Sequence, residues 1–376
     1  MDLHAPMPLL GGLSPDVFMR RHWEKKPLLV RQAWPGVRPP IDRGGLFALA
    51  ASDDVESRLV VHDGPAWRLR SGPLPRRALP AVSRPGWTLL VQGLDLHLDA
   101  ARALLEPFRF VPEARLDDLM MSWASDGGGV GPHVDAYDVF LLQVHGRRRW
   151  RVGRVGDRRW IDGLPLRILQ RFEPQFDWVL EPGDMLYLPP LWGHDGIAVG
   201  ECMTCSVGFR SPNRDELAGE LLQRLADVAA EAATDAPLYR DPRQPATDRP
   251  GQVPDALQAF ARAALQRLLA DPRSLQGALG EALTEPKPRV WFDAVDRPPA
   301  EGGVRLDRRT RMLYDARHVF VNGEAYRVAG RDATLLRQLA DHRRLGAAAR
   351  RRLGPDARRA VVEWLSAGWL QPVEEP

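Results

Sequence analysis

Short β-like segments separated by turn residues follow one another from Asp117 to about Phe209. The segments read DDLMMSWA, YDVFLLQVHG, RRWRVG, DWVLEPGDMLYLPP, GIAVG and CMTCSVGF. Short strands that recur at regular spacing are typical of a β-barrel or a β-sandwich. Upstream, Ser14 followed by Pro15 is a good helix start, and the stretch from Pro27 to Val30 reads as a strand that enters this β-domain.

The pattern changes from strands to helices at Ser211. Asn213 followed by Glu216 has the spacing of a capping box, and leucines at helical spacing come next. A proline-rich stretch, 237–254, interrupts, and a second amphipathic helix then carries Leu257 and Phe260. These apolar stripes pack either within the chain or against a second copy, and we expect a homodimer.

The C-terminal part, from about Arg289, mixes a hairpin with helices. The segment HVFVNGEAYRV has Asn322-Gly323 at its centre, which is a strong hairpin signal. Helical stretches follow at 333–340, 347–353 and 355–366, and the chain ends in AGWLQPVE. Helices that end in a short β-segment predict a winged-helix domain.

Composition bounds the class of protein. The chain has 376 residues, a formal net charge of +3 and two cysteines. No run of 18 apolar residues is present, so we expect no membrane span, and two cysteines fit a reducing cytoplasm. The charge is too balanced to indicate a nucleic-acid binder by itself, and we do not expect direct nucleic-acid binding.

Two histidines and an aspartate have the spacing of a metal site. His133 and Asp135 form an H-x-D at the start of a predicted strand, where both side chains can point to one face. His194 follows about sixty residues later, within the pattern G-D-x-L-Y-x-P-P-x-x-x-H. Two histidines and one carboxylate, with the other positions open, are the ligands of Fe(II) oxygenases. The sequence therefore predicts an iron site at His133, Asp135 and His194.

Three consecutive arginines follow the strand that begins after Asp135. They alternate faces on the next strand, and Arg148 shares its face with Trp150 and Val152. If that face is the barrel interior, Arg148 is buried and needs an anion, and a guanidinium suits a carboxylate. We expect Arg148 to bind the distal carboxylate of 2-oxoglutarate.

These motifs resemble the Jumonji-C oxygenases, and more closely the bacterial ribosomal oxygenases, the family of ribosomal protein arginine 3-hydroxylases. The resemblance covers nearly the whole chain and rests on FMRRHWEKKPLLVRQA, DDLMMSWASDGGGVGPHVDAYDVFLLQVHGRRRWRVG and LEPGDMLYLPPLWGHDGIA. It implies a mixed α and β protein with a cupin-like, double-stranded β-helix (jelly-roll) JmjC barrel over residues 1–210. A helical dimerisation region, 211–287, and a winged-helix domain, 288–376, would follow.

The resemblance also implies a reaction and its cofactors. Fe(II) would be bound by His133, Asp135 and His194, and 2-oxoglutarate by Arg148, with O2 as the oxidant and succinate and CO2 as coproducts. One departure concerns the second contact to the 2-oxoglutarate carboxylate. Relatives carry a hydroxyl residue near Ala124, whereas the nearby hydroxyls here are Ser122 and Ser125, and we predict Ser122.

The family's usual substrate is an arginine, hydroxylated at C3, on the large-subunit ribosomal protein numbered sixteen. An arginine needs an acidic partner and flat apolar walls near the iron. Asp118 is the candidate for the guanidinium, and Met120 and Tyr137 are the candidates for its alkyl stem. All three residues also suit ordinary barrel packing.

Two other functions stay open at this stage. The same iron could serve an N-methyl demethylase, although no aromatic cage can be recognised in the sequence. Alternatively, the chain is a non-catalytic protein that binds the ribosome or nucleic acid through its winged helix. Basic residues at 350–352 are available for that role, but Asp332, Asp341 and Glu363 dilute the charge.

Overall fold

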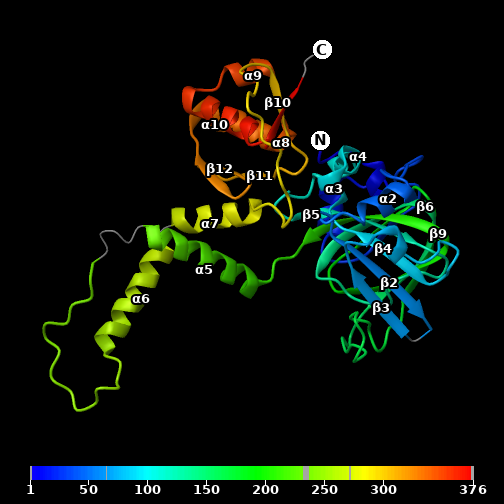
Figure 1. The fold of residues 1–376 in the computed structure, drawn as a ribbon, viewed down its shortest axis with the longest axis horizontal. Coiled ribbons are helices and arrows are strands. Elements are labelled where there is room, and N and C mark those ends of the chain that lie inside the picture. The colour runs from blue at the N-terminus through cyan, green and yellow to red at the C-terminus, as the bar shows by residue number, and fades with distance from the viewer. Residues whose placement is uncertain (1, 65, 232–236, 271, 374–376) are drawn as a thin grey trace. The chain divides into compact units, whose positions relative to one another are not determined.

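The computed structural model describes residues 2–64, 66–231, 237–270 and 272–373. The chain divides into two compact units, Met1–Ser211 with Pro288–Trp291, and Pro212–Lys287 with Phe292–Pro376 (Figure 1). The helices that follow Ser211 thus cluster with the C-terminal part of the chain, and the division into three domains stays a prediction. In the described part of the chain, no helix is both long and apolar enough to cross a membrane.

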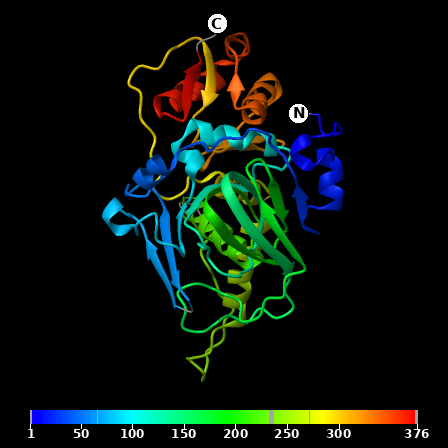
Figure 2. The ribbon, with the colours of Figure 1, turned by 90° about the vertical axis from the view of Figure 1, so that its right-hand side faces the viewer.

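An antiparallel sheet dominates the first unit. Its order over the described residues is β1-β8-β6-β9-β5-β4-β2-β3, with β7 paired to β6, and Figure 2 shows the central strands curling around one another. The strands are β1 (Leu28–Val30), β2 (Ser57–Asp63), β3 (Ala66–Ser71), β4 (Trp87–Val91), β5 (Leu116–Ala124), β6 (Tyr137–Arg154), β7 (Phe176–Leu180), β8 (Met185–Leu188) and β9 (Trp192–Arg210). The predicted strand at 27–30 and the β-structure of 117–209 are therefore confirmed. The division into short strands is wrong at two places, because YDVFLLQVHG and RRWRVG form the single strand β6, and GIAVG and CMTCSVGF lie in the single strand β9. Bulges in the pairing of β6 with β9, and not turns, lie between these segments.

Short helices accompany this sheet. They are α1 (Pro15–Arg21), α2 (Arg43–Leu49), α3 (Leu94–His97) and α4 (Asp99–Leu104), with 3-10 turns at Pro8–Leu10, Arg76–Ala78 and Glu106–Phe108. The predicted helix start is confirmed, because the Ser14 hydroxyl accepts a hydrogen bond of 3.3 Å from the Val17 N–H.

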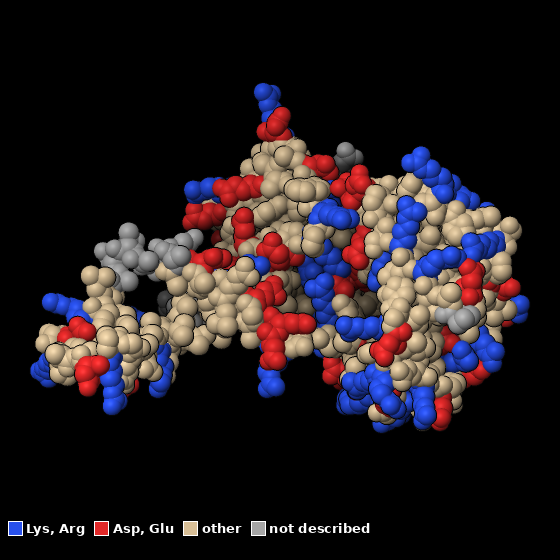
Figure 3. All heavy atoms as spheres, turned by 60° about the horizontal axis from the view of Figure 1, so that its bottom comes forward, with Lys and Arg blue, Asp and Glu red and all other residues tan. Residues whose placement is uncertain are grey.

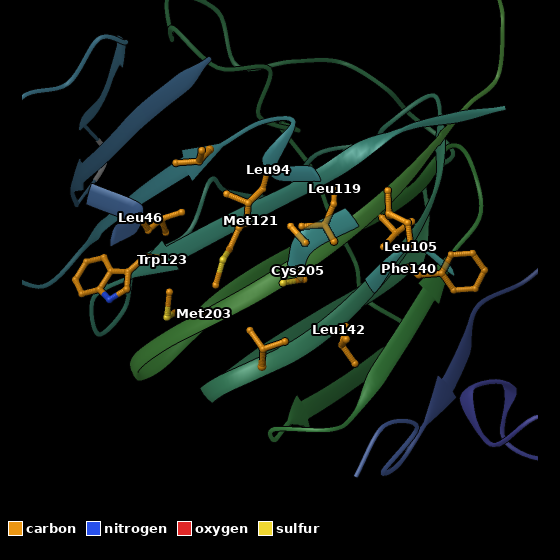
Figure 4. Close-up of a cluster of buried hydrophobic side chains, with 14 of the residues drawn as sticks. Leu46, Leu94, Leu105, Leu119, Met121, Trp123, Phe140, Leu142, Met203 and Cys205 are labelled. Carbon is orange, nitrogen blue, oxygen red and sulfur yellow. The ribbon is translucent and has the colours of Figure 1, made fainter. Parts of the chain in front are cut away.

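The two faces of the central strands have different surroundings. Alternate residues of β5, such as Leu119, Met121 and Trp123, join the main hydrophobic core (Figure 4). Phe140 of β6 and Cys205 of β9 belong to the same core. Since side chains alternate along a strand, the even-numbered residues of β5 lie on the opposite face, and the candidate site is built on that face.

The second unit contains three long helices and a smaller α/β region. The helices are α5 (Arg214–Glu231), α6 (Asp255–Ala270) and α7 (Pro272–Thr284). The remaining elements are β10 (Gly303–Leu306), β11 (Met312–Tyr314), β12 (His318–Val321), β13 (Glu324–Arg327), α8 (Gly330–His342), β14 (Arg344–Leu345), α9 (Ala347–Arg351), α10 (Pro355–Ser366) and β15 (Leu370–Val373).

The predicted hairpin and C-terminal helices are confirmed. β12 pairs with β13 around Asn322 and Gly323, whose φ angles of 49° and 88° are those that a tight hairpin turn requires. Leu336 and Leu339 of α8 and Val361 and Trp364 of α10 are buried in one core. This part of the chain therefore has a hydrophobic core of its own.

Candidate functional site

His133 and His194 are brought together by backbone pairing. The His133 N–H donates to the His194 carbonyl at 3.0 Å, and the His194 N–H donates to the His133 carbonyl at 2.9 Å. The two imidazole centroids lie 4.2 Å apart as a result. This β-bridge joins the segment before β6 to the start of β9, so two histidines distant in sequence become neighbours.

Each imidazole is oriented by a nearby carbonyl. Nδ1 of His133 lies 2.8 Å from the carbonyl oxygen of Gly131, and Nδ1 of His194 lies 3.1 Å from that of Trp192. A ring nitrogen must carry its proton to donate to a carbonyl, which leaves Nε2 of the neutral ring as a lone-pair donor. The two Nε2 atoms lie 3.7 Å and 3.4 Å from Oδ2 of Asp135.

Among the described residues, these three side chains form the only cluster of His, Cys, Asp or Glu that could bind a metal ion. Their ligand atoms all lie within 4.8 Å of one another. Two imidazole nitrogens and one carboxylate oxygen on one side of a common point suit a divalent transition metal such as Fe(II). Nδ1–H bonds of this kind hold metal-binding histidines in their tautomer and orientation.

Hydrogen bonds and charge interactions within the cluster of His133, Asp135 and His194 shift the pKa values of His133 and Asp135. Burial favours the neutral form of His133, but hydrogen bonding and attraction to Asp135 outweigh it, and the pKa of His133 is raised. Burial likewise opposes ionisation of Asp135, yet its hydrogen bonds with His133 and His194 hold the pKa of that carboxyl well below its usual range. Asp135 is therefore ionised at neutral pH and offers its negative charge to a cation.

Glycines allow the close approach of the segments around the histidines. A Cβ at Gly129 would lie 2.6 Å from the carbonyl oxygen of Gly196, and a Cβ at Gly196 would lie 2.7 Å from the ring of Trp150. Because such contacts are too short for real Cβ atoms, larger residues would push the His133 segment away from β9.

Arg148 is buried on β6, while its neighbours are exposed. Its side chain is 5% exposed, whereas Arg147 and Arg149 point to solvent and Arg149 pairs with Asp177. Nη1 of Arg148 donates to the Ser122 hydroxyl at 2.9 Å. No acidic side chain of the described residues pairs with Arg148, and its buried Nε has no hydrogen-bond partner among them. A buried guanidinium with an unpartnered N–H suits a carboxylate ligand such as the distal end of 2-oxoglutarate.

The candidate second hydroxyl is at Ser122 and not at Ser125. Ser125 is turned away and bonds the backbone of Trp87. Ala124 lies on the same face of β5 as Ser122, in a small apolar cluster with Ala198 and Cys202. Of the two nearby serines, only Ser122 therefore contacts Arg148.

Two residues that the sequence analysis did not predict, Thr204 and Gln143, belong to the hydrogen-bond network around Arg148. Nη1 of Arg148 lies 3.3 Å from Oγ1 of Thr204, and the Thr204 hydroxyl donates to Oε1 of Gln143 at 2.9 Å. Thr204 lies on β9 and faces Ser122 on one side and Gln143 on the other. No local sequence pattern predicts that Ser122, Thr204 and Gln143 are neighbours, because only the pairing of the three strands brings them together.

The three residues predicted to contact the substrate lie near one another. Asp118 is 4% exposed, and its Oδ2 accepts hydrogen bonds from the Gly93 N–H at 2.9 Å and the Gln92 side chain at 3.3 Å. A Cβ at Gly208 would lie 4.0 Å from Oδ1 of Asp118 and 3.7 Å from the ring of Tyr137. Both side chains therefore border the space beside Gly208.

Half-buried Met120 follows Asp118 on the same face of β5. Burial and the nearby charge of Asp117 raise the pKa of Tyr137, so its hydroxyl stays protonated. An acidic group, a thioether and a phenol thus line one end of the face that carries Ser122. This composition suits a guanidinium on an alkyl stem.

Comparisons with known proteins match both halves of the chain. Residues 103–217 match the model of the JmjC domain, and residues 267–371 match that of the ROXA-like winged helix. The ribosomal protein uL16 3-hydroxylase of Escherichia coli K12 is 36% identical over 322 residues, which cover 82% of this chain and 84% of the relative.

Solved structures agree along nearly the whole chain. The X-ray structure of E. coli YcfD is 32% identical, with a TM-score of 0.83, and the match covers 95% of this chain and 97% of that one. The structure of YcfD, described as a ribosomal oxygenase, in complex with cobalt and 2-oxoglutarate has a TM-score of 0.79 at 31% identity, over the same shares of both chains. The predicted fold class, a JmjC cupin-like domain followed by a winged helix, is therefore confirmed.

Proposed function

Because the chain belongs to the JmjC-domain ribosomal oxygenases, we propose that His133, Asp135 and His194 hold its Fe(II). The convergence of these three ligand groups is the observation that carries the proposal. Arg148 and Ser122 bind the distal carboxylate of 2-oxoglutarate. The unpartnered Nε of Arg148 supports this assignment.

The protein is a 2-oxoglutarate-dependent oxygenase. When bound, Fe(II) and 2-oxoglutarate supply the activation of O2, with succinate and CO2 as coproducts. The chain's own residues bind and orient the reactants. The Nδ1–H bonds to the carbonyls of Gly131 and Trp192 fix the orientation of both rings and direct Nε2 toward the metal position. The apolar cluster of Ala124, Ala198 and Cys202 lies on the same face of the sheet as Arg148.

The substrate is an arginine side chain of the large-subunit ribosomal protein uL16, hydroxylated at C3. The E. coli relative is named ribosomal protein uL16 3-hydroxylase, which supports uL16 as the substrate. Asp118 provides a negative charge for the guanidinium, and Met120 and Tyr137 line its alkyl stem. Gly208 leaves the space between Asp118 and Tyr137 clear of a side chain.

Mass spectrometry of uL16 tests the proposal. Purified protein is incubated with Fe(II), 2-oxoglutarate, O2 and uL16 lacking the modification, beside a His133→Ala control. We expect uL16 to gain one oxygen atom on an arginine with the active protein only. Turnover of 2-oxoglutarate without oxygen on uL16 would disprove the substrate, and formaldehyde release would point to a demethylase.

We further propose that the protein acts as a homodimer in the cytoplasm. Helix α6 has no buried residue in the described structure, although Leu257, Phe260, Leu265 and Leu269 lie on it. A helix of 16 residues with this many exposed apolar side chains gains stability from a partner surface. Sedimentation equilibrium should give twice the mass of the chain, and a Leu265→Glu/Leu269→Glu variant should sediment as a monomer.

Direct contact with nucleic acid is not part of the proposed function. On the face shown in Figure 3, basic and acidic side chains are interspersed. A protein that neutralises many phosphates carries a concentrated basic stripe. Electrophoretic shifts of RNA or DNA at physiological salt should therefore be absent.

A further inference from the structure

Three buried polar side chains form a row across three neighbouring strands. Ser122 of β5 is opposite Thr204 of β9, and Thr204 is in turn opposite Gln143 of β6. They are 2%, 1% and 0% exposed, respectively. Polar groups this deeply buried are expected to be fully engaged in hydrogen bonds, which makes the direction of each bond informative.

Gln143 can have only one orientation of its amide. Its Nε2 donates to the carbonyl oxygens of His145 at 2.7 Å and Gly146 at 3.2 Å, where β6 bulges. A flipped amide would place oxygen against these two acceptors. The backbone of Gln143 is also held, since its N–H donates to the backbone carbonyl of Asp184 and its own carbonyl accepts from the Gly183 N–H. Oε1 therefore faces Thr204 as a fixed acceptor.

This fixed acceptor determines where the Thr204 proton points. The hydroxyl donates to Oε1 of Gln143 at 2.9 Å, so only oxygen lone pairs remain for Arg148. Nη1 of Arg148 lies 3.3 Å from this oxygen and 2.9 Å from the oxygen of Ser122. Both hydrogens of Nη1 are thereby used by hydroxyl groups, and the buried Nε–H is left without a partner among the described residues.

We propose that Gln143 is a positioning residue for 2-oxoglutarate, which acts through Thr204 to hold the Arg148 guanidinium with its Nε edge turned to the carboxylate. The inference rests on the proposed function, because it assigns the ligand of Arg148. Without Gln143, the buried Thr204 hydroxyl loses the acceptor that fixes its proton and its side-chain rotamer. Its oxygen is then no longer held where it accepts from Nη1, and the guanidinium keeps only the contact with Ser122 to fix its rotation.

A double-mutant cycle with direct binding measurements tests this proposal. 2-Oxoglutarate is titrated by calorimetry into full-length protein loaded with Mn(II), without any protein substrate. Gln143→Met and Thr204→Val should each weaken binding about tenfold, as expected for a lost hydrogen bond to a charged group. The double variant should also bind about tenfold more weakly than the wild type, because both changes break the same chain of bonds.

The controls separate positioning from general damage. Thr88 is buried and its hydroxyl has no hydrogen-bond partner in the described structure, so Thr88→Val matches Thr204→Val and should leave binding within about twofold. Thr204→Ser retains the hydroxyl and should restore most of the affinity. If Gln143→Met does not fold, the cycle is run with Gln143→Asn, whose amide is one methylene shorter and does not reach Thr204.

The outcomes distinguish this inference from the proposed function. Additive losses, about a hundredfold in the double variant, would mean that Gln143 supports the bulge and not Thr204, and would overturn the inference. Unchanged binding in Gln143→Met would overturn it as well. If the wild-type protein itself does not bind 2-oxoglutarate, the proposed function fails first.

Discussion

The two ends of the candidate site use the same strands in different ways. The metal end consists of His133, Asp135 and His194, and its two imidazoles are held by carbonyls within two residues of each ring. The carboxylate end consists of Arg148, Ser122, Thr204 and Gln143, which come from three different strands. At the metal end, each imidazole is oriented by a carbonyl close to it in sequence, and one β-bridge brings the two histidines together. At the carboxylate end, the side chains are held by hydrogen bonds between three strands.

The difference predicts how each end responds to mutation. A metal ligand cannot be replaced by its neighbours, because the donors come from single residues with preset tautomers. At the carboxylate end, several side chains position one guanidinium. Removal of one of them should therefore weaken 2-oxoglutarate binding only partly. The largest effects are therefore expected at the metal end.

His194→Ala should have the largest effect. Loss of a ligand should reduce metal affinity and turnover by more than about a hundredfold, since even the loss of a residue that only supports a ligand costs 10–100-fold. Metal titration followed by succinate release measures both quantities. His342→Ala removes an exposed histidine of α8 and should match the wild type. Nearly normal metal affinity in His194→Ala would contradict the assignment of the metal end.

Arg148→Met should come next and should affect only the carboxylate end. The loss of charge-assisted bonds to a carboxylate predicts an increase of about a hundredfold in the KM for 2-oxoglutarate, with unchanged metal affinity. Arg149→Met is the matched control, because Arg149 lies next to it on β6 but is exposed and pairs with Asp177. Equal effects of the two variants would argue against a carboxylate ligand at Arg148.

Asp138 should make stability depend on pH in the direction opposite to Asp135. Asp138 is buried, and its burial raises the pKa to about 6, although Tyr187 and Arg115 bond to it. The folded state therefore binds a proton that the unfolded state releases near pH 4. This contribution is fully present below pH 4 and is lost as the pH rises through 6.

Asp138→Asn removes that titration. Relative to this variant, the unfolding free energy of the wild type should fall by about 2 kcal/mol between pH 4 and pH 7. Urea denaturation at a series of pH values measures the difference. A constant difference across this range would show that folding does not raise the pKa of Asp138.

Gly208→Val should have the smallest effect and should spare both ends. Its side chain would enter the space between Asp118 and Tyr137, so the KM for uL16 should rise about tenfold. The affinities for metal and 2-oxoglutarate should stay unchanged, because neither ligand set touches Gly208. Steady-state kinetics with each reactant varied in turn separates these quantities, and a selective loss of 2-oxoglutarate affinity would place the substrate elsewhere.

Local signals in the sequence determined much of the fold. The Ser14 cap and the Asn322-Gly323 turn depend on residues within a few positions of one another, and both are confirmed. The burial of Arg148 between exposed Arg147 and Arg149 follows from the period of two along a strand. Such features are predictable because the physical interaction and the sequence pattern span the same few residues.

The partners of Arg148 were decided by tertiary structure. The alternation of β5 places Ser122 and Ala124 on one face, but only the pairing of β5 with β9 shows which of them stands beside Thr204. Gln143 and Thr204 are far apart in sequence, and β6 bulges immediately after Gln143. Strand register depends on non-local pairing and on bulges, which a single sequence does not display. The sequence by itself therefore determined the residue types of the site, and the register of three strands decided which of them meet.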